Sequence, residues 1–131
     1  MIIEDNTKIF IDQLKKITPE LLVGVGNEAY KSIYNFMTED KIVDTGRLRG
    51  SLSYSTDGYD YNQPTLANYP TDFIKGVTDK DAVIIGSNVE YASFVNSGTS
   101  KQRARRFMEV GITRAVPQIK KVVKIILQEN F

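Results

Sequence analysis

Two stretches near opposite ends of the chain carry apolar residues at helical spacing, and they set the narrowest limit on the fold. Within residues 107–128 an apolar side chain recurs every three or four positions: Met108, Ile112, Ala115, Ile119, Val122 and Ile126. Residues 22–36 repeat the pattern with Leu22, Val25, Ala29, Ile33 and Phe36. Each pattern predicts an amphipathic helix with one apolar stripe. Two such helices need a common core, to which the middle of the chain must contribute.

Prolines and glycines interrupt both predicted helices. Thr18 is suited to an N-cap and Pro19 to a first helical position, so the first helical stretch is expected to restart there. Gly24 and Gly26 each weaken a helix by about 1 kcal/mol relative to Ala, and they leave room for close packing or a bend. Pro117 predicts a kink or a fresh start in the last helix.

The middle of the chain indicates short strands. Residues 51–56 alternate small polar side chains with larger ones, and a turn signal at 57–58 leads to a returning strand at 59–61. Residues 82–86 are continuously apolar and rich in β-branched side chains, which is typical of a strand. Residues 62–76 contain Pro, Gly, Asn and Gln and predict an exposed loop.

Two short helices are also expected. Asp44 is suited to cap a helical turn that ends by Leu52. Asn88 is suited to cap a second helix through Ser97, with Gly98 in the left-handed position after it. We therefore predict one α+β domain over all 131 residues, with a small antiparallel sheet packed against long N- and C-terminal helices.

Composition removes several kinds of chemistry. The chain has no Cys and no His, which excludes Ser-His-Asp and Cys-His catalysis and Cys/His zinc sites. Residues 24–26 lack the Lys-Ser/Thr pair of a phosphate-binding loop, and Glu39, Asp40 and Asp44 lack the spacing of a calcium loop. We expect no enzyme, cofactor, metal or small-molecule substrate, although a hydrolase with a carboxylate pair stays open as a minor alternative. The acidic start, residues 1–5, predicts neither secretion nor a membrane segment.

Positive charge is concentrated near the C-terminus, whereas the whole chain has a net charge of only +1. Residues 101–124 have one acidic residue, Glu109, and eight basic ones: Lys101, Arg103, Arg105, Arg106, Arg114, Lys120, Lys121 and Lys124. The three lysines are expected on a solvated helix face. The four basic residues at 101–106 are candidate contacts to an acidic surface or to phosphates, and a nucleic-acid-associated protein is therefore an alternative function.

Four of the seven tyrosines lie between residues 54 and 69, namely Tyr54, Tyr59, Tyr61 and Tyr69. Tyrosine is enriched both at protein interfaces and in strands. Both interpretations stay open from the sequence.

Three segments, in this order and at this spacing, resemble a known family. They are DTGRLR at residues 44–49, VEYAxxVxxGT at 89–99 and ARxF at 104–107. The set is similar to the small neck proteins of tailed bacteriophages, the tail-completion or head–tail joining family to which the lambda tail-completion protein Z is related. The resemblance covers roughly residues 1–127, with the loop at 62–76 as its variable part. One departure is Arg106, where the family usually has Pro.

The resemblance implies a structural virion component, made in the bacterial host cytoplasm and placed at the neck or tail. It implies a ring of about six copies that contacts neighbouring neck and tail proteins, and non-specific contact with passing DNA. Asp44 is expected to cap a turn, and Gly46 to let the chain pass close to a neighbour. Arg103, Arg105 and Arg106 are expected to meet acidic residues of the next subunit. The matching motif positions are Asp44, Thr45, Gly46, Arg47, Leu48, Tyr91, Ala92, Val95, Gly98, Thr99 and Phe107; of these, Tyr91, Val95 and Phe107 are expected to pack the short helix onto the core.

Overall fold

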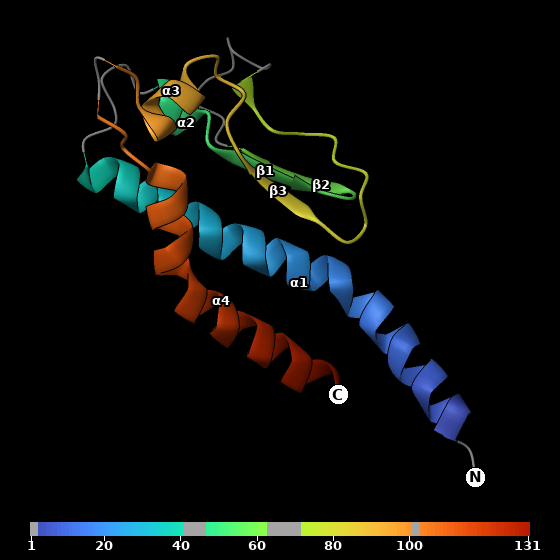
Figure 1. The fold of residues 1–131 in the computed structure, drawn as a ribbon. Helices are drawn as coiled ribbons and strands as arrows, with labels where there is room; N and C mark the ends of the chain where they lie inside the picture. The colour runs from blue at the N-terminus through green and yellow to red at the C-terminus, as the bar shows by residue number, and fades with distance from the viewer. Residues whose placement is uncertain (1–2, 41–46, 63–71, 101–102) are drawn as a thin grey trace.

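A computed structural model describes residues 3–40, 47–62, 72–100 and 103–131, apart from the side chains of residues 3–14 and Ser93. Its elements are α1 (Ile3–Glu39), α2 (Arg47–Gly50), β1 (Ser53–Thr56), β2 (Tyr59–Asn62), β3 (Val83–Gly86), α3 (Ala92–Ser97) and α4 (Phe107–Asn130). Long helices at both ends and a three-stranded antiparallel sheet confirm the predicted α+β class (Figure 1). None of the helices in the described ranges has the length and hydrophobicity that crossing a lipid bilayer requires.

The long helix α1 is the middle layer of the molecule. The sheet lies on one side of α1, and α4 packs along the other side (Figure 1). The short helices α2 and α3 lie together at one end, close to the start of α4. The N-terminal part of α1 extends beyond the rest of the molecule, past the C-terminal end of α4.

The central strand β1 pairs with both other strands in the order β2-β1-β3. Tyr54 lies opposite Tyr61 of β2 and Ile85 of β3. Leu52 and Tyr54 belong to the core on the α1 side, whereas the alternate positions are serines: Ser51, Ser53 and Ser55. These serines are completely buried, so the opposite face of β1 is also covered.

Residues 72–82 cover that serine face. The backbone N–H of Ile74 donates to Ser53 Oγ at 2.7 Å, and that of Val77 donates to Ser55 Oγ at 2.9 Å. Asp72 and Phe73 are buried. The expectation of an exposed loop over 62–76 is therefore wrong at residues 72 and 73, whereas residues 75 and 76 are exposed as expected. Residues 63–71, which include Tyr69, lie outside the described residues.

Both long helices continue through their prolines. α1 is unbroken at Pro19, so the predicted restart capped by Thr18 is wrong, and α4 is unbroken at Pro117. Both proline rings are exposed, on the side where water can bind the carbonyl that loses its partner. The kink predicted for the last helix agrees with the bend of α4 in Figure 1.

The short helix α3 begins later than expected and without a side-chain cap. Asn88 does not cap it; the Asn88 backbone N–H donates to the Asp72 carbonyl at 2.8 Å, and its side-chain amide donates to the Phe73 carbonyl at 3.1 Å. Asn88 thus holds the covering segment in place. Gly98 follows α3 with φ 80° and ψ 173°, a positive φ as expected but outside the left-handed helical region.

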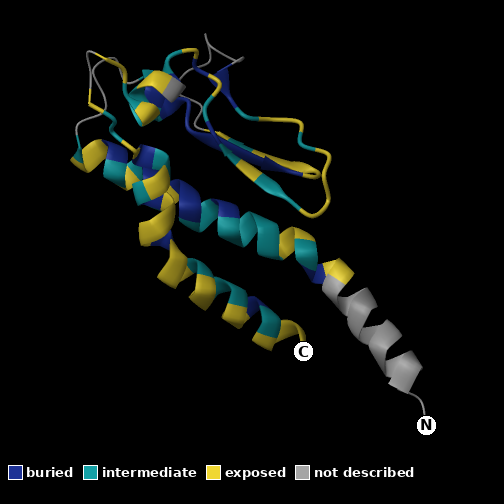
Figure 2. Cartoon of the chain, in the orientation of Figure 1, coloured by how far each residue is buried: buried dark blue, intermediate teal, exposed yellow. Residues whose placement is uncertain are grey.

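The hydrophobic core lies between β1, α1 and the start of α4, and Figure 2 shows the buried positions along β1 and the inner side of α1. On α4 the buried residues are Phe107, Gly111, Ala115 and Ile126. The predicted stripe is partly displaced, because Gly111 rather than Ile112 faces α1. A Cβ on Gly111 would lie 2.7 Å from Ile33 Cα, so only Gly fits at this crossing.

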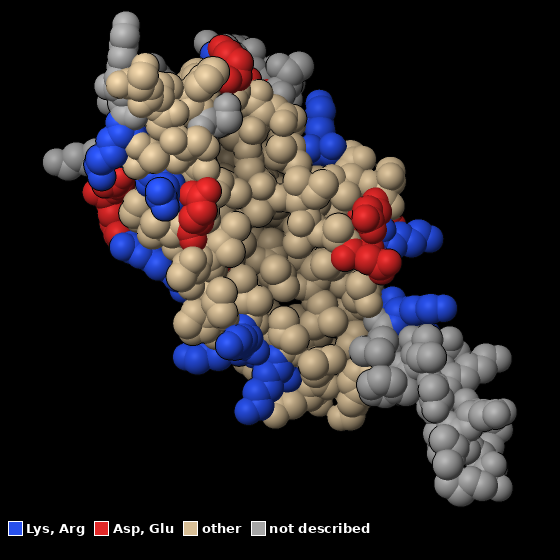
Figure 3. Space-filling view, viewed as in Figure 1, with Lys and Arg blue, Asp and Glu red and all other residues tan. Residues whose placement is uncertain are grey.

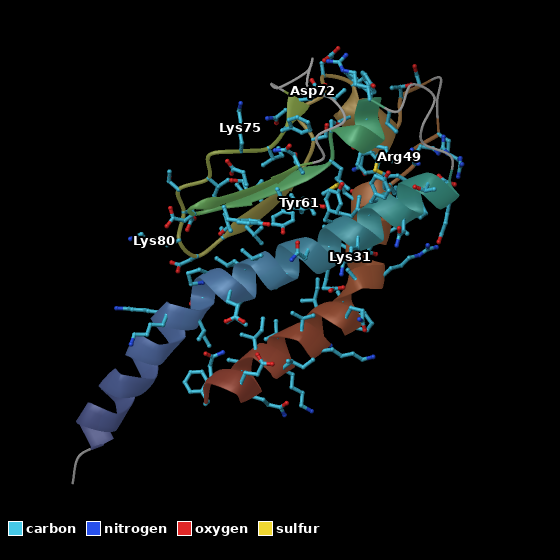
Figure 4. All side chains as sticks on the ribbon, turned by 180° about the vertical axis from the view of Figure 1, so that it is seen from behind. Lys31, Arg49, Tyr61, Asp72, Lys75 and Lys80 are labelled. Atoms are coloured by element: carbon cyan, nitrogen blue, oxygen red, sulfur yellow. The ribbon has the colours of Figure 1, made fainter. Side chains whose placement is uncertain are left out.

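The tyrosines of the sheet belong mainly to this core. Tyr61 stacks on Tyr54 with ring centroids 5.3 Å apart, and Tyr30 of α1 packs edge-on against Tyr61 at 5.0 Å. The labelled Tyr61 lies between the sheet and α1 in Figure 4. Burial raises the pKa of the Tyr54 phenol well above its ordinary value. Tyr59, in contrast, is 42% exposed.

Candidate functional site

Arg47, in the first resemblance segment, contacts a buried carboxylate at residue 72 and an exposed one, Glu90, in the second segment. Its Nε donates to Asp72 Oδ2 at 2.9 Å and its Nη2 to Asp72 Oδ1 at 3.0 Å, a bidentate pair in which the Asp72 side chain is 4% exposed. Nη2 also lies 3.4 Å from Glu90 Oε2, and the guanidinium lies 5.9 Å from the Tyr91 ring centroid. The hydrogen bond to Asp72 raises the pKa of Arg47 above its already high value. Through these contacts with Asp72, Glu90 and Tyr91, Arg47 holds α2, residue 72 and the turn before α3 together.

The second and third segments are joined by backbone and side-chain hydrogen bonds. The N–H groups of Arg105 and Arg106 donate to the carbonyls of Val95 and Asn96, both at 3.0 Å. The Asn96 side-chain oxygen accepts from the Met108 N–H at 3.1 Å. Arg106, at the N-cap position of α4, makes no side-chain cap hydrogen bond. Asn96, from the neighbouring helix α3, provides that cap instead.

Arg106 adopts a backbone conformation that the sequence did not predict. It precedes α4 with φ 51° and ψ 37°, in the left-handed region. Proline cannot adopt a positive φ and has no N–H to donate to Asn96. The geometry at this position is thus incompatible with the Pro that the phage family usually has there.

Arg105, a predicted contact to a neighbouring subunit, is bound within its own chain. Its Nε donates to Asp40 Oδ2 at 2.9 Å, and its Nη2 donates to the Asp40 backbone carbonyl. In the same way Arg114 pairs with Glu39 at 2.9 Å, with both side chains more than half exposed. These two pairs fix the end of α1 against the start of α4. Arg105 therefore has a role within the fold, and its expected contact with a neighbouring subunit stays a prediction.

The other predicted contact residues and the motif positions lie only partly within the described part of the chain. Arg103 and Arg106 are exposed, and Lys101 lies outside the described residues. Among the motif positions, Asp44, Thr45 and Gly46 also lie outside them. Of the other motif positions, Leu48, Ala92 and Phe107 lie in the core, and Tyr91 and Val95 pack against it. Gly98 donates its N–H to the Phe94 carbonyl, and Thr99 is exposed.

A second apolar line runs along α4 on a side that α1 does not cover. Ile112 and Val116 are each 39% exposed, and the spacing continues through Ile119, Val123 and Leu127. Near the C-terminus this line forms an open groove of about 660 Å³, the α4 groove, lined by Ile119, Lys120, Val123, Lys124, Leu127, Gln128 and Phe131. Figure 3 shows basic side chains gathered over the C-terminal half of α4.

No protein-family model, curated protein or solved structure matches this chain.

The described part of the chain offers little for metal chemistry. Among its residues no three His, Cys, Asp or Glu side chains are grouped so that they could hold a metal ion. Glu39 and Asp40, considered from the sequence as part of such a group, pair with Arg114 and Arg105 instead. The interactions that the described residues provide at this end of the molecule are apolar packing and ion pairs.

Sequence reasoning missed Asp72, Asn96 and the second line of α4. The line could have been found, because residues 112, 116, 119, 123 and 127 repeat at spacings of three and four in the printed sequence. Asp72 could not have been found, because its partner Arg47 lies 25 residues away and nothing local indicates the pairing.

Proposed function

We propose that the chain is a structural protein of a tailed phage or prophage, which joins or completes the tail at the head–tail interface as a ring of copies. The proposal starts from the resemblance of three segments to the neck and tail-completion family. It describes a protein whose function is to bind copies of itself and adjoining particle proteins.

The observation that carries the proposal is the physical connection of those three segments. Arg47, from the first, contacts Glu90 of the second, and Arg105 and Arg106, from the third, bond to the end of α3. The first and second segments have 39 residues between them and the second and third have four, and their described residues form one unit at one end of the molecule (Figure 1). The left-handed Arg106 is a local departure from the family pattern within this unit.

The nucleic-acid alternative has lost part of its basis. It relies on the positive charge of residues 101–124, and Arg105 and Arg114 of that segment are paired with carboxylates of α1. Lys120, Lys121 and Lys124 are exposed and still contribute positive potential. Contact with DNA passing through a ring is compatible with this arrangement but does not require sequence recognition.

Deletion of the gene from the phage or prophage that encodes the chain tests the proposal. We expect electron micrographs of the lysate to show filled heads and separate tails, and we expect the infectious titre to fall by orders of magnitude. A plasmid that expresses the wild-type chain restores joined particles, and the same plasmid with an early stop codon does not. Normal particles at normal titre in the deletion strain would falsify the proposal.

A further inference from the structure

Helix α4 is apolar over a wider sector than packing against α1 requires. Successive residues of a helix are 100° apart, so the line that begins at Ile112 lies about 100° around α4 from the line that begins at Gly111. Gly111 is buried and Ala115 is 2% exposed, whereas Ile112 and Val116 are each 39% exposed. An exposed apolar line of this length on a helix surface is typical of a binding surface.

The rim of the α4 groove is positively charged. Lys120 and Lys124 line it beside Ile119, Val123 and Leu127, and both lysines are exposed. The ion pairs found in the described part of the chain include neither of them. Two such grooves facing each other would bring lysines together, which disfavours a symmetric α4–α4 contact. The groove instead fits an apolar helix with acidic side chains.

The first third of α1 is a helix of this composition. Residues 1–14 contain three acidic side chains, Glu4, Asp5 and Asp12, and one basic side chain, Lys8. The sequence also places Phe10 and Leu14 at helical spacing. The backbone of this part of α1 is helical from Ile3 and extends past the rest of the molecule in both Figure 1 and Figure 4, which view it from opposite sides.

We propose that the α4 groove of one subunit binds the residue 3–14 helix of a second copy of this chain. The groove and the segment are different surfaces of one polypeptide, so the contact is heterologous and continues from subunit to subunit. Such a contact closes into a ring when the rotation per subunit divides a full turn. The proposal rests on the proposed function only in taking a closed ring as the final assembly.

Disulfide cross-linking between single-cysteine variants tests the contact directly, because the natural chain has no Cys. One full-length protein carries Asn6→Cys or Gln13→Cys in the segment, and the other carries Gln128→Cys in the groove. Lys121→Cys, exposed on the same part of α4 but outside the groove lining, is the matched control. Using both segment positions covers either direction of the bound helix.

After mixing and mild oxidation, we expect the segment–groove heterodimer in several-fold excess over the segment–Lys121→Cys heterodimer. Circular dichroism confirms beforehand that each variant is folded. Equal yields for groove and control, no heterodimer at millimolar protein, or a dominant disulfide between two Gln128→Cys chains would overturn the proposal.

A charge exchange provides an independent readout. Lys120→Glu with Lys124→Glu in the groove protein is expected to lower the heterodimer yield several-fold, and Asp5→Lys with Asp12→Lys in the segment protein is expected to restore it. A heterodimer yield that neither pair of substitutions alters contradicts the charge argument. If the variants cross-link but the protein is absent from phage particles, the proposed function is refuted and the groove contact stands. If the protein is present in particles but the variants do not cross-link, only the groove contact is refuted.

Discussion

Substitution of Gly111 by Ala should destabilise the protein although Ala is the better helix former. An Ala Cβ at this position would lie 2.4 Å from Ile33 Cγ1 and 2.7 Å from Ile33 Cα, too close for any real contact. Because one of these atoms belongs to the α1 backbone, a rotamer change cannot relieve the overlap, and the two helices must move apart. The 2.6 Å hydrogen bond from Ser32 Oγ to the Gly111 carbonyl lies at the same crossing and is strained by that movement.

The magnitude follows from two opposing terms. Replacing Gly by Ala in a helix contributes about 1 kcal/mol of stability. Overpacking against a backbone costs about 3 kcal/mol, the upper part of the usual range. The free energy of unfolding should therefore fall by about 2 kcal/mol, or roughly 6–10 °C in melting temperature for a chain of this length.

Urea unfolding followed by circular dichroism measures this difference. Gly24→Ala is the matched control, because its Cβ would meet only side-chain atoms, Val122 Cγ1 at 2.9 Å and Ile126 Cδ1 at 3.3 Å. Small movements of those side chains offset the helix gain, so the control should stay within about 1 kcal/mol of wild type. If Gly111→Ala is as stable as wild type while the control behaves as expected, the close crossing of α1 and α4 is wrong.

Three further outcomes are expected. Arg105→Ala should lower the free energy of unfolding by about 1–3 kcal/mol in urea titrations because it removes the bonds to the end of α1, whereas the exposed Arg103→Ala should change it little; equal effects would contradict the intramolecular role. Asp72→Asn should lower the melting temperature in calorimetry because the buried bidentate pair with its arginine is lost, and an unchanged value would contradict the pairing. The raised pKa of Tyr54 means that folding favours its neutral phenol, so this contribution to the free energy of unfolding is complete below about pH 10 and is lost as the pH rises further. In urea titrations, Tyr54→Phe should reduce the fall of the free energy of unfolding with alkaline pH more than Tyr59→Phe does. Identical pH dependence in the two variants would refute the role of Tyr54.

The elements that the sequence predicted well are those specified locally. The hairpin turn at Asp57 and Gly58 and the strand at 83–86 are where the residue types indicate them, because turn chemistry and β-branched side chains act over a few residues. The restart at Pro19 was wrong: α1 continues through this exposed proline, so the loss of one backbone hydrogen bond does not end the helix.

The candidate site was less predictable because its contacts are long-range. The Arg105–Asp40 pair joins residues 65 positions apart, and no local pattern shows that an arginine in a basic loop is bound within its own chain. The displaced stripe of α4 has a similar cause, since the small size of Gly111 matters only once Ile33 lies against it. Charge and periodicity identified the basic segment and the apolar stripe of α4 from the sequence. Which of their residues bind within the chain could be seen only from the packing of α4 against α1.

The central claim is that this chain is an assembled particle component, and the copy number per particle tests it most directly. Quantitative mass spectrometry of density-purified particles, with isotope-labelled peptides of the chain as standards, measures that number. The account predicts about six copies per particle, as for one closed ring at the neck. A signal no higher than in particles from the deletion strain, or copies in the hundreds, would contradict it.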